Sequence, residues 1–252
     1  MDEARATVAS GNEPFPRRIL QTWKTHALPP RFAAWRQTWL ALHPNYEHFL
    51  WSDADNRAFV RRKFPEYLAV YDRYPREIER VDAVRYMFLY DQGGLYADLD
   101  QEALRSFDPL LERHQEADVV LGCLGHAPGA EHHAIPNSLM ISKPKADFWK
   151  FVLAEMVRRA PGSGHGTDPV LDAVEYKTGP VLLTDCATRY RGASRITILE
   201  PEAFYPINWA SMEPLHQPLR QQIVYGGAHL PNSEAKKLFP NSWTVAYWTH
   251  TW

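Results

Sequence analysis

The feature that most constrains the fold of this chain is a helical pattern that runs into a strand through two glycines. Apolar residues recur at helical spacing over residues 76–92. Gly93 and Gly94 end this helix, because glycine is favoured just past a helix end. The apolar run of residues 95–98 then follows as a buried strand. A helix that leads directly into a buried strand indicates an α/β fold.

Further strands and helices alternate along the chain. Strands are expected at residues 18–23, 46–51, 118–124, 138–142, 195–200 and 244–248. Helices are expected at 30–40, at 54–64, from 65, at 145–159 and at 179–190. This alternation predicts an α/β domain with a mixed sheet. Residues 1–16 are polar and punctuated by Pro and Gly, which predicts a flexible tail, and residues 17–252 show no linker and are expected to form one domain.

The pair Asp98 and Asp100, which ends the strand after the two glycines, is the strongest candidate site. Ligands of open α/β sheets bind beside the carboxyl ends of strands. Two acids at a buried strand end are costly unless a cation pairs with them. Carboxylate oxygens suit Mn²⁺ or Mg²⁺, which also bind the oxygens of a diphosphate. An aspartyl-phosphatase motif or a calcium loop fits poorly, because Gln101, Glu102 and Ala103 follow the pair.

Two other acidic patterns have simpler interpretations. Asp53 and Asp55 form a second DxD, but they open a basic helix, so a helix cap is the favoured reading. Asp82 and Arg85 lie three residues apart on one helix face. They are either a hydroxyl acceptor and a donor in one cleft or a surface ion pair of little energetic value. Spacing alone slightly favours the surface pair.

Charge and hydropathy bound the partners of the chain. The net charge of −2 argues against a general nucleic-acid binder, which carries a basic face. The sequence has no run of eighteen apolar residues and no apolar core of a signal peptide near its start. The expectation is therefore a cytoplasmic protein without a transmembrane segment, or a catalytic domain truncated from a longer protein.

The order of these motifs resembles glycosyltransferase family 32, the DXD sugar-binding glycosyltransferases. The resemblance rests on Ile19–Trp23, Asn45–Tyr46, Trp51–Asp53, Asp82–Tyr86 and Leu89–Asp100, and further along on Asn137–Met140, Thr178–Pro180, Phe204–Pro206 and Thr251–Trp252. The family includes fungal mannosyltransferases and bacterial capsular polysaccharide enzymes, with the glucosyltransferases of large clostridial toxins as distant relatives. Its members usually have histidines shortly before a closing Ser-Trp, whereas this chain has Ala246–Trp248 with His250 offset.

The resemblance implies a GT-A type fold, a Rossmann-like nucleotide-sugar transferase fold with a central mixed sheet flanked by helices. It implies that Asp100 and Asp98 bind Mn²⁺ or Mg²⁺, and that these two acids and Arg85 form the catalytic group. The donor-binding residues it implies are Gln21, Thr22, Trp23, Asp82, Arg85, Tyr96, Asp98, Asn137, Thr251 and Trp252. Among them, Trp23 would stack on the base, and Thr251 and Trp252 would close as a C-terminal lid.

The expected activity is that of a metal-dependent, retaining hexosyltransferase. A UDP- or GDP-sugar would donate mannose, galactose, glucose or N-acetylglucosamine to an acceptor hydroxyl on a glycan or glycolipid. Retention would follow from front-side displacement, in which the acceptor proton passes to a β-phosphate oxygen. Two alternatives are a non-catalytic sugar-binding module of the same fold and a toxin-like transferase that glycosylates a protein.

Overall fold

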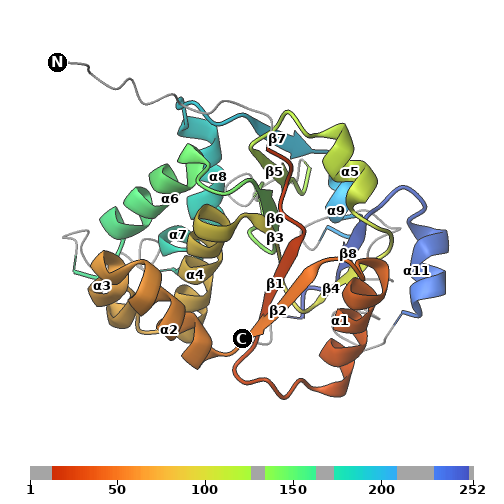
Figure 1. The fold of residues 1–252 in the computed structure, drawn as a ribbon, viewed down its shortest axis with the longest axis horizontal. Helices are drawn as coiled ribbons and strands as arrows, with labels where there is room; N and C mark the ends of the chain where they lie inside the picture. The colour runs from red at the N-terminus through yellow and green to blue at the C-terminus, as the bar shows by residue number, and fades with distance from the viewer. Residues whose placement is uncertain (1–12, 126–133, 163–172, 209–229, 250–252) are drawn as a thin grey trace.

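A six-stranded sheet forms the centre of the molecule, in the order β2-β1-β3-β6-β5-β7 (Figure 1). The structure, a computed structural model, describes residues 13–125, 134–162, 173–208 and 230–249. The strands are β1 (Arg18–Thr22), β2 (Glu47–Trp51), β3 (Gly94–Ala97), β5 (Val119–Gly122), β6 (Leu139–Ser142) and β7 (Ile196–Leu199). β6 runs antiparallel to its neighbours β3 and β5, whereas the other adjacent pairs are parallel. The sheet is therefore mixed, as the sequence predicts.

Two layers cover the faces of this sheet (Figure 1). One layer contains α2 (Asp53–Lys63), α3 (Leu68–Arg73), α4 (Glu77–Gln92), α6 (Asp147–Arg158), α7 (Val174–Lys177) and α8 (Pro180–Arg189). The other contains α1 (Pro30–Leu42), α5 (Asp108–Arg113), α9 (Pro201–Phe204), α11 (Asn232–Leu238) and a ribbon of β4 (Gln101–Ala103) and β8 (Thr244–Ala246). A 3-10 turn, Pro65–Tyr67, joins α2 to α3.

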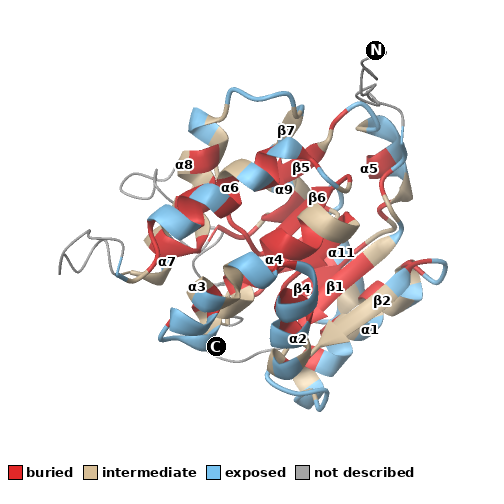
Figure 2. Ribbon diagram, turned by 60° about the vertical axis from the view of Figure 1, so that its left-hand side comes forward, coloured by how far each residue is buried: buried red, intermediate tan, exposed pale blue. Residues whose placement is uncertain are grey.

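Alternating residues of the central strands divide the core between these layers. Leu20 and Tyr96 point into the cluster that contains α4 and α6, whereas Ile19, Leu95 and Ile141 point into the cluster on the opposite face. Figure 2 shows the resulting buried strands between partly exposed helices. The site therefore stands on a sheet that is packed on both sides.

The connection from α4 to β3 requires the two glycines that the sequence singles out. Gly93 and Gly94 have φ angles of 65° and 93°, a left-handed region that residues with a side chain rarely adopt. A Cβ atom on Gly94 would lie 2.6 Å from the carbonyl oxygen of Arg18 on the neighbouring strand. The close approach sets β3 beside β1, and Asp98 and Asp100 follow at its carboxyl end.

The elements predicted from the sequence are all present, with ends that differ by a few residues. The sequence did not indicate the short elements β4, α5, α7, α9 and α11. Phe15 lies in the stretch predicted as a tail, but it is buried in the core cluster around Ile19. The last strand stops at Ala246, two residues earlier than expected, and Trp248 has a φ of 49°.

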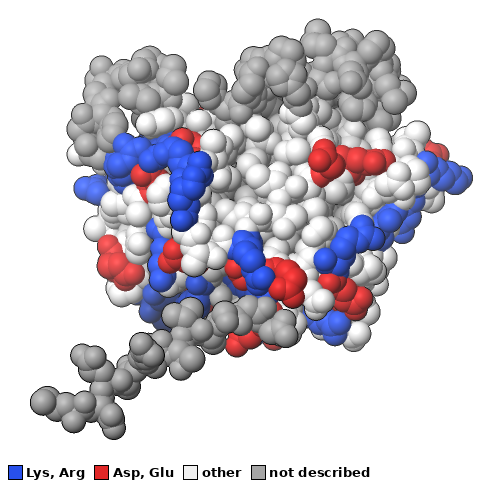
Figure 3. Space-filling view, turned by 90° about the horizontal axis from the view of Figure 1, so that it is seen from above, with Lys and Arg blue, Asp and Glu red and all other residues white. Residues whose placement is uncertain are grey.

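The surface carries charges of both signs. On the face shown in Figure 3, Lys and Arg lie among Asp and Glu around the margin, and the centre is uncharged. Within the described ranges, no helix combines the length and the apolar character needed to cross a membrane.

Candidate active site

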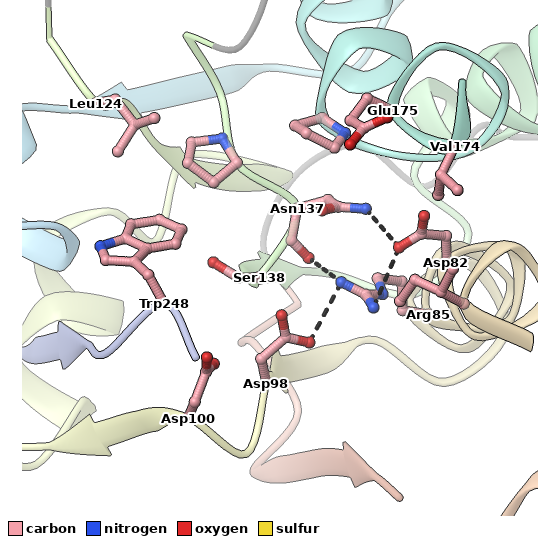
Figure 4. A pocket seen from close by; sticks show the side chains of 13 residues that line it. Asp82, Arg85, Asp98, Asp100, Leu124, Asn137, Ser138, Val174, Glu175 and Trp248 are labelled. Carbon is pink, nitrogen blue, oxygen red and sulfur yellow. Dashed lines mark hydrogen bonds and ion pairs between the residues drawn. The ribbon is translucent and has the colours of Figure 1, made fainter. Parts of the chain in front are cut away.

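A cavity of about 310 Å³ opens at the carboxyl end of β3. Asp82 and Arg85 reach it from α4, and Asp98 and Asp100 reach it from the segment after β3 (Figure 4). Asn137 arrives from the opposite strand direction: because β6 is antiparallel to β3, with Leu139 paired to Ala97, the residues before β6 meet those after β3. Three separate segments thus bring their polar side chains to one cavity.

Arg85 is the centre of the polar contacts in this cavity (Figure 4). Its Nη2 lies 3.1 Å from Asp82 Oδ1, and its Nη1 lies 3.3 Å from Asp98 Oδ1. Nη1 also donates to the carbonyl oxygen of Asn137 at 2.9 Å, and the guanidinium lies 4.4 Å from the ring centre of Tyr96. The Arg85 side chain is only 1% exposed, so the surface-pair reading of Asp82 and Arg85 is wrong. Asn137, Tyr96 and Asp98, which enclose the Arg85 side chain, come from other segments of the chain, which spacing along one helix cannot reveal.

The two carboxylates that flank Arg85 have further donors. Asp82 accepts from Asn137 Nδ2 at 2.9 Å and from Thr178 Oγ1 at 3.0 Å. Asp98 accepts from Tyr96 OH at 2.6 Å. Each carboxylate is therefore held in one orientation at the cavity wall.

Burial outweighs this pairing in the electrostatics of the site. Desolvation raises the pKa of Asp98 to about 7, against the lowering effect of Arg85, and the nearby charge of Asp100 raises it further. Desolvation likewise raises the pKa of Asp82. Burial opposes the charge of Arg85, but Asp98, Tyr96 and Asp82 together raise its pKa above its ordinary value. The site thus holds more negative charge than its arginine compensates.

Asp100 is tied to the end of the described chain. Its Oδ2 accepts from the backbone N–H of Thr249 at 2.8 Å and from Thr249 Oγ1 at 3.0 Å. The neighbouring Trp248 lines the cavity, with its indole nitrogen bonded to the carbonyl oxygen of Ile207 at 2.8 Å. The C-terminal segment thus forms one wall of the site.

The residues at the DXD motif fit a divalent cation. Asp98 and Asp100 are 5% and 6% exposed and line the same cavity, and the charge of Asp100 adds to the rise in the pKa of Asp98 that desolvation causes. Two protein carboxylates are few for a dedicated metal site, and no group of three or more His, Cys, Asp or Glu in the described ranges could hold an ion. Mg²⁺ and similar ions are commonly held by one or two carboxylates and the phosphates of the substrate.

A second pocket adjoins the first and shares Asp98 and Asp100 with it. It lies beyond the end of β1, and its walls include Thr22, Trp23 and Phe32. The half-buried ring of Trp23 lies 4.7 Å from that of Phe32. Thr22 and Trp23 therefore lie next to the DXD motif, as the resemblance implied.

Other predicted site residues lie elsewhere. Gln21 is buried within β1 and lines neither of these two pockets, and its amide nitrogen has no hydrogen-bond partner among the described residues. Tyr96 lies behind Asp98, where its hydroxyl and the Thr22 hydroxyl are 3.3 Å apart. Thr251, Trp252 and His250 lie outside the described residues, so the C-terminal lid stays a prediction.

The structure adds site residues that the sequence analysis missed. Thr178 bonds to Asp82, and Tyr86 donates to the carbonyl oxygen of Thr178 at 2.7 Å and accepts from Asn137 at 3.0 Å. Thr178 belongs to the Thr178–Pro180 motif on which the family resemblance rests, but the resemblance implied no role for it. Tyr86 closes the Asp82–Tyr86 motif of the same resemblance, also without an assigned role, because an aromatic residue in a buried helix most often packs in the core.

The second DxD motif separates into two roles. Ser52 is the N-cap of α2, and Asp55 completes a capping box by accepting from the Ser52 backbone N–H at 2.9 Å. The predicted cap is therefore confirmed for this motif. Asp53, by contrast, lines the second pocket together with Trp23.

Comparisons with known proteins agree with this geometry. Residues 29–117 match the family described as a glycosyltransferase sugar-binding region containing the DXD motif. The inositol phosphoceramide mannosyltransferase 3 of Schizosaccharomyces pombe is 31% identical over 241 residues, which cover 94% of this chain and 60% of that protein. The initiation-specific alpha-1,6-mannosyltransferase of Candida albicans is 29% identical over 44% of this chain and 32% of its own length. The chain thus spans less than two thirds of these relatives.

One solved structure supports the fold. The PaToxG glycosyltransferase has a TM-score of 0.53 over 92% of this chain and 90% of its own, at 14% sequence identity. Likeness at this identity concerns the fold alone. It confirms the expected α/β class, the GT-A type.

Proposed function

We propose that the chain is a hexosyltransferase, from the premise that residues 29–117 match the glycosyltransferase sugar-binding region that contains the DXD motif. Its substrate would be a nucleoside-diphosphate sugar, and its acceptor a hydroxyl of a glycan or glycolipid. The observation that carries the proposal is the convergence of Asp82, Arg85, Asp98, Asp100 and Asn137 on one cavity.

The two adjoining pockets divide the donor between them. The pocket beside Trp23 takes the base, and the larger cavity beside Asp82 and Asn137 takes the sugar, so the diphosphate crosses the Asp98–Asp100 boundary that the pockets share. Asp82 accepts hydrogen bonds from sugar hydroxyls and Asn137 fixes the ring next to it. Fixed polar groups of this kind orient a ligand within an otherwise apolar cavity.

Asp98 and Asp100 would hold a Mn²⁺ or Mg²⁺ ion, which supplies positive charge to the departing diphosphate. Arg85 orients Asp82 and Asp98 and favours their ionised forms against the effect of burial, because its guanidinium lies between them. Preorganised charges in a buried site stabilise a transition state without reorganising during the reaction.

The acceptor hydroxyl would approach from the face on which the diphosphate departs. Its proton would pass to a β-phosphate oxygen, and the anomeric configuration would be retained. Detection of a product with inverted configuration would contradict this part of the proposal while leaving the transferase activity intact.

The activity is tested by incubating the protein with Mn²⁺ and a panel of UDP- and GDP-sugars without acceptor. We expect slow release of free nucleotide from one donor, loss of release with EDTA, and about 10²–10³-fold slower release in an Asp100→Ala variant. The matched control is Asp72→Asn, which removes an exposed carboxylate paired with Arg57, away from both pockets. It should release nucleotide at the wild-type rate.

Two outcomes would contradict the proposal. Release that persists in Asp100→Ala would show that the DXD motif takes no part in it. Failure to release nucleotide from any donor, together with failure to bind UDP or GDP, would favour the non-catalytic sugar-binding alternative.

A further inference from the structure

The pocket beside Trp23 is lined by acidic residues other than those of the DXD motif. Asp53 and Glu77, the first residues of α2 and α4, line this pocket together with Lys24. Asp53 follows β2 and Asp98 follows β3, and β1, with Trp23 after its end, lies between these two strands, so Trp23 separates Asp53 from the DXD motif along the sheet edge. The ring of Phe32 lies beside that of Trp23. A flat group that extends from the diphosphate across these rings would therefore present its far edge to carboxylates.

Asp53 is the acid that is available to a ligand. Asp55 completes the capping box with Ser52, so Asp53 is not required as a cap. The Asp53 carboxylate makes no hydrogen bond or ion pair with any described residue, whereas Glu77 pairs with Arg80. Desolvation and then the charge of Glu77 raise the pKa of Asp53 to about 6. A half-buried carboxylate of this kind gains from a ligand that brings hydrogen-bond donors.

The nucleobases differ in the donors they offer at that edge. Guanine presents two adjacent donors, N1–H and the 2-amino group, which match the two oxygens of a carboxylate. Uracil presents one N–H between two carbonyl oxygens, and these repel a carboxylate. Adenine places an acceptor nitrogen beside its amino group. An unpaired carboxylate at the base end of the pocket therefore selects guanine.

We propose that Asp53 reads the N1–H and 2-amino donors of guanine, so that the donor of this enzyme is a GDP-sugar. This inference rests on the proposed function, since it assumes that the pocket beside Trp23 takes the base. It makes Asp53 a specificity-determining residue, and it leaves the sugar and the acceptor to the larger cavity.

The test is isothermal titration of the protein with GDP, UDP, inosine diphosphate and xanthosine diphosphate in the presence of Mn²⁺. Inosine lacks the 2-amino donor of guanine, and xanthosine replaces it with a carbonyl oxygen. We expect GDP to bind at least tenfold more tightly than UDP, with inosine diphosphate between them, since hydrogen bonds to a charged group contribute about 1.5–3 kcal/mol.

An Asp53→Asn variant should change which nucleotide binds more tightly, rather than only weaken the binding of GDP. Its amide can donate to the xanthine 2-carbonyl, so affinity for GDP should fall at least tenfold and affinity for xanthosine diphosphate should rise above that of the wild type. Glu77→Gln is the matched variant on the same pocket wall. It should weaken GDP binding by less than about threefold, because Glu77 already pairs with Arg80.

The outcomes separate this inference from the proposed function. Preferential binding of UDP, or an unchanged GDP preference in Asp53→Asn, would overturn the guanine assignment and leave the transferase proposal standing. Failure of the wild type to bind any of the four nucleotides would overturn both. The gain of xanthosine diphosphate binding cannot arise from misfolding, so it supports the assignment directly.

Discussion

Two ionic clusters in this molecule are both built from carboxylates and arginines, but the pKa of a carboxylate is raised in one and lowered in the other. The site cluster consists of Asp82, Arg85 and Asp98, whose side chains are 1–5% exposed. The α6–α8 cluster consists of Glu155, Arg158, Arg159, Asp185 and Arg189. Arg158 and Arg189 are each 48% exposed, whereas Arg159 is 3% exposed. The pKa of Asp98 is raised to about 7, chiefly by desolvation, whereas hydrogen bonds from Arg158 lower the pKa of Glu155 to about 2.

The difference lies in the balance between pairing and the loss of water. In the α6–α8 cluster Glu155 is paired with three arginines, and the two that hydrogen-bond to it, Arg158 and Arg189, keep part of their hydration, so the ionised carboxylate is favoured. In the site cluster all partners are buried, and pairing does not compensate the desolvation of the acids. A cluster that is retained against such a cost indicates a functional role, because perturbed acids concentrate where chemistry occurs.

The largest effect is expected from Arg85→Met. This change leaves the carboxylates of Asp82 and Asp98 buried without a counter-charge, which typically costs 3–5 kcal/mol of unfolding free energy. Denaturant unfolding followed by fluorescence measures the loss, and nucleotide release should fall below detection in the same variant. A destabilisation under about 1 kcal/mol would mean that the acids are protonated in the free protein and that Arg85 does not stabilise them.

A smaller effect on stability, but a large one on turnover, is expected from Asp98→Asn. Removing a desolvated charge offsets the loss of its pairing to Arg85, so unfolding free energy should change by less than about 1 kcal/mol. Nucleotide release should nevertheless fall about 10²–10³-fold, because the amide is a poor ligand for a divalent ion. If Asp98→Asn instead lost as much free energy of unfolding as it lost in activation free energy of nucleotide release, the site cluster would be a stabilising ion pair like the α6–α8 cluster, which would contradict the comparison.

The smallest effect is expected from Glu155→Gln, with a loss of about 1 kcal/mol in unfolding free energy and no change in nucleotide release. The pKa of Glu155 is depressed in the folded state, so its contribution is fully present above the unfolded value of 4.5 and is lost as the pH falls toward 2. The difference in stability between wild type and variant should therefore shrink over that range. A difference that stays constant with pH would contradict the ionic origin of the effect.

The sequence predicted much of the fold because its strongest patterns are local. The helix pattern before Gly93, the two glycines and the strand after them define where Asp98 and Asp100 stand, and the structure agrees. The cap at the start of α2 was predictable for the same reason, although its form, a capping box of Ser52 and Asp55, was not. The missed elements are mostly short, and α7 and α9 have four residues each, too few to show a period.

The site was less predictable where it depends on contacts between distant segments. Thr178 meets Asp82 across 96 positions, and Thr249 meets Asp100 across 149. No spacing within one helix or strand contains such information. Asp53 and Asp55 are two residues apart at a helix start, so the sequence indicates a cap for both, and only the packing beside Trp23 shows that Asp53 lines a pocket.

The bonds from Thr249 to Asp100 have a thermodynamic consequence. The same carboxylate is held by the C-terminal segment and faces the cavity in which a diphosphate would bind. Any ligand that changes the charge or position of Asp100 must change the free energy of those bonds, and by reciprocity the state of the segment must change the affinity for the ligand. The DXD motif and the chain around Thr249 therefore respond as one coupled unit, although 149 positions separate Thr249 from Asp100.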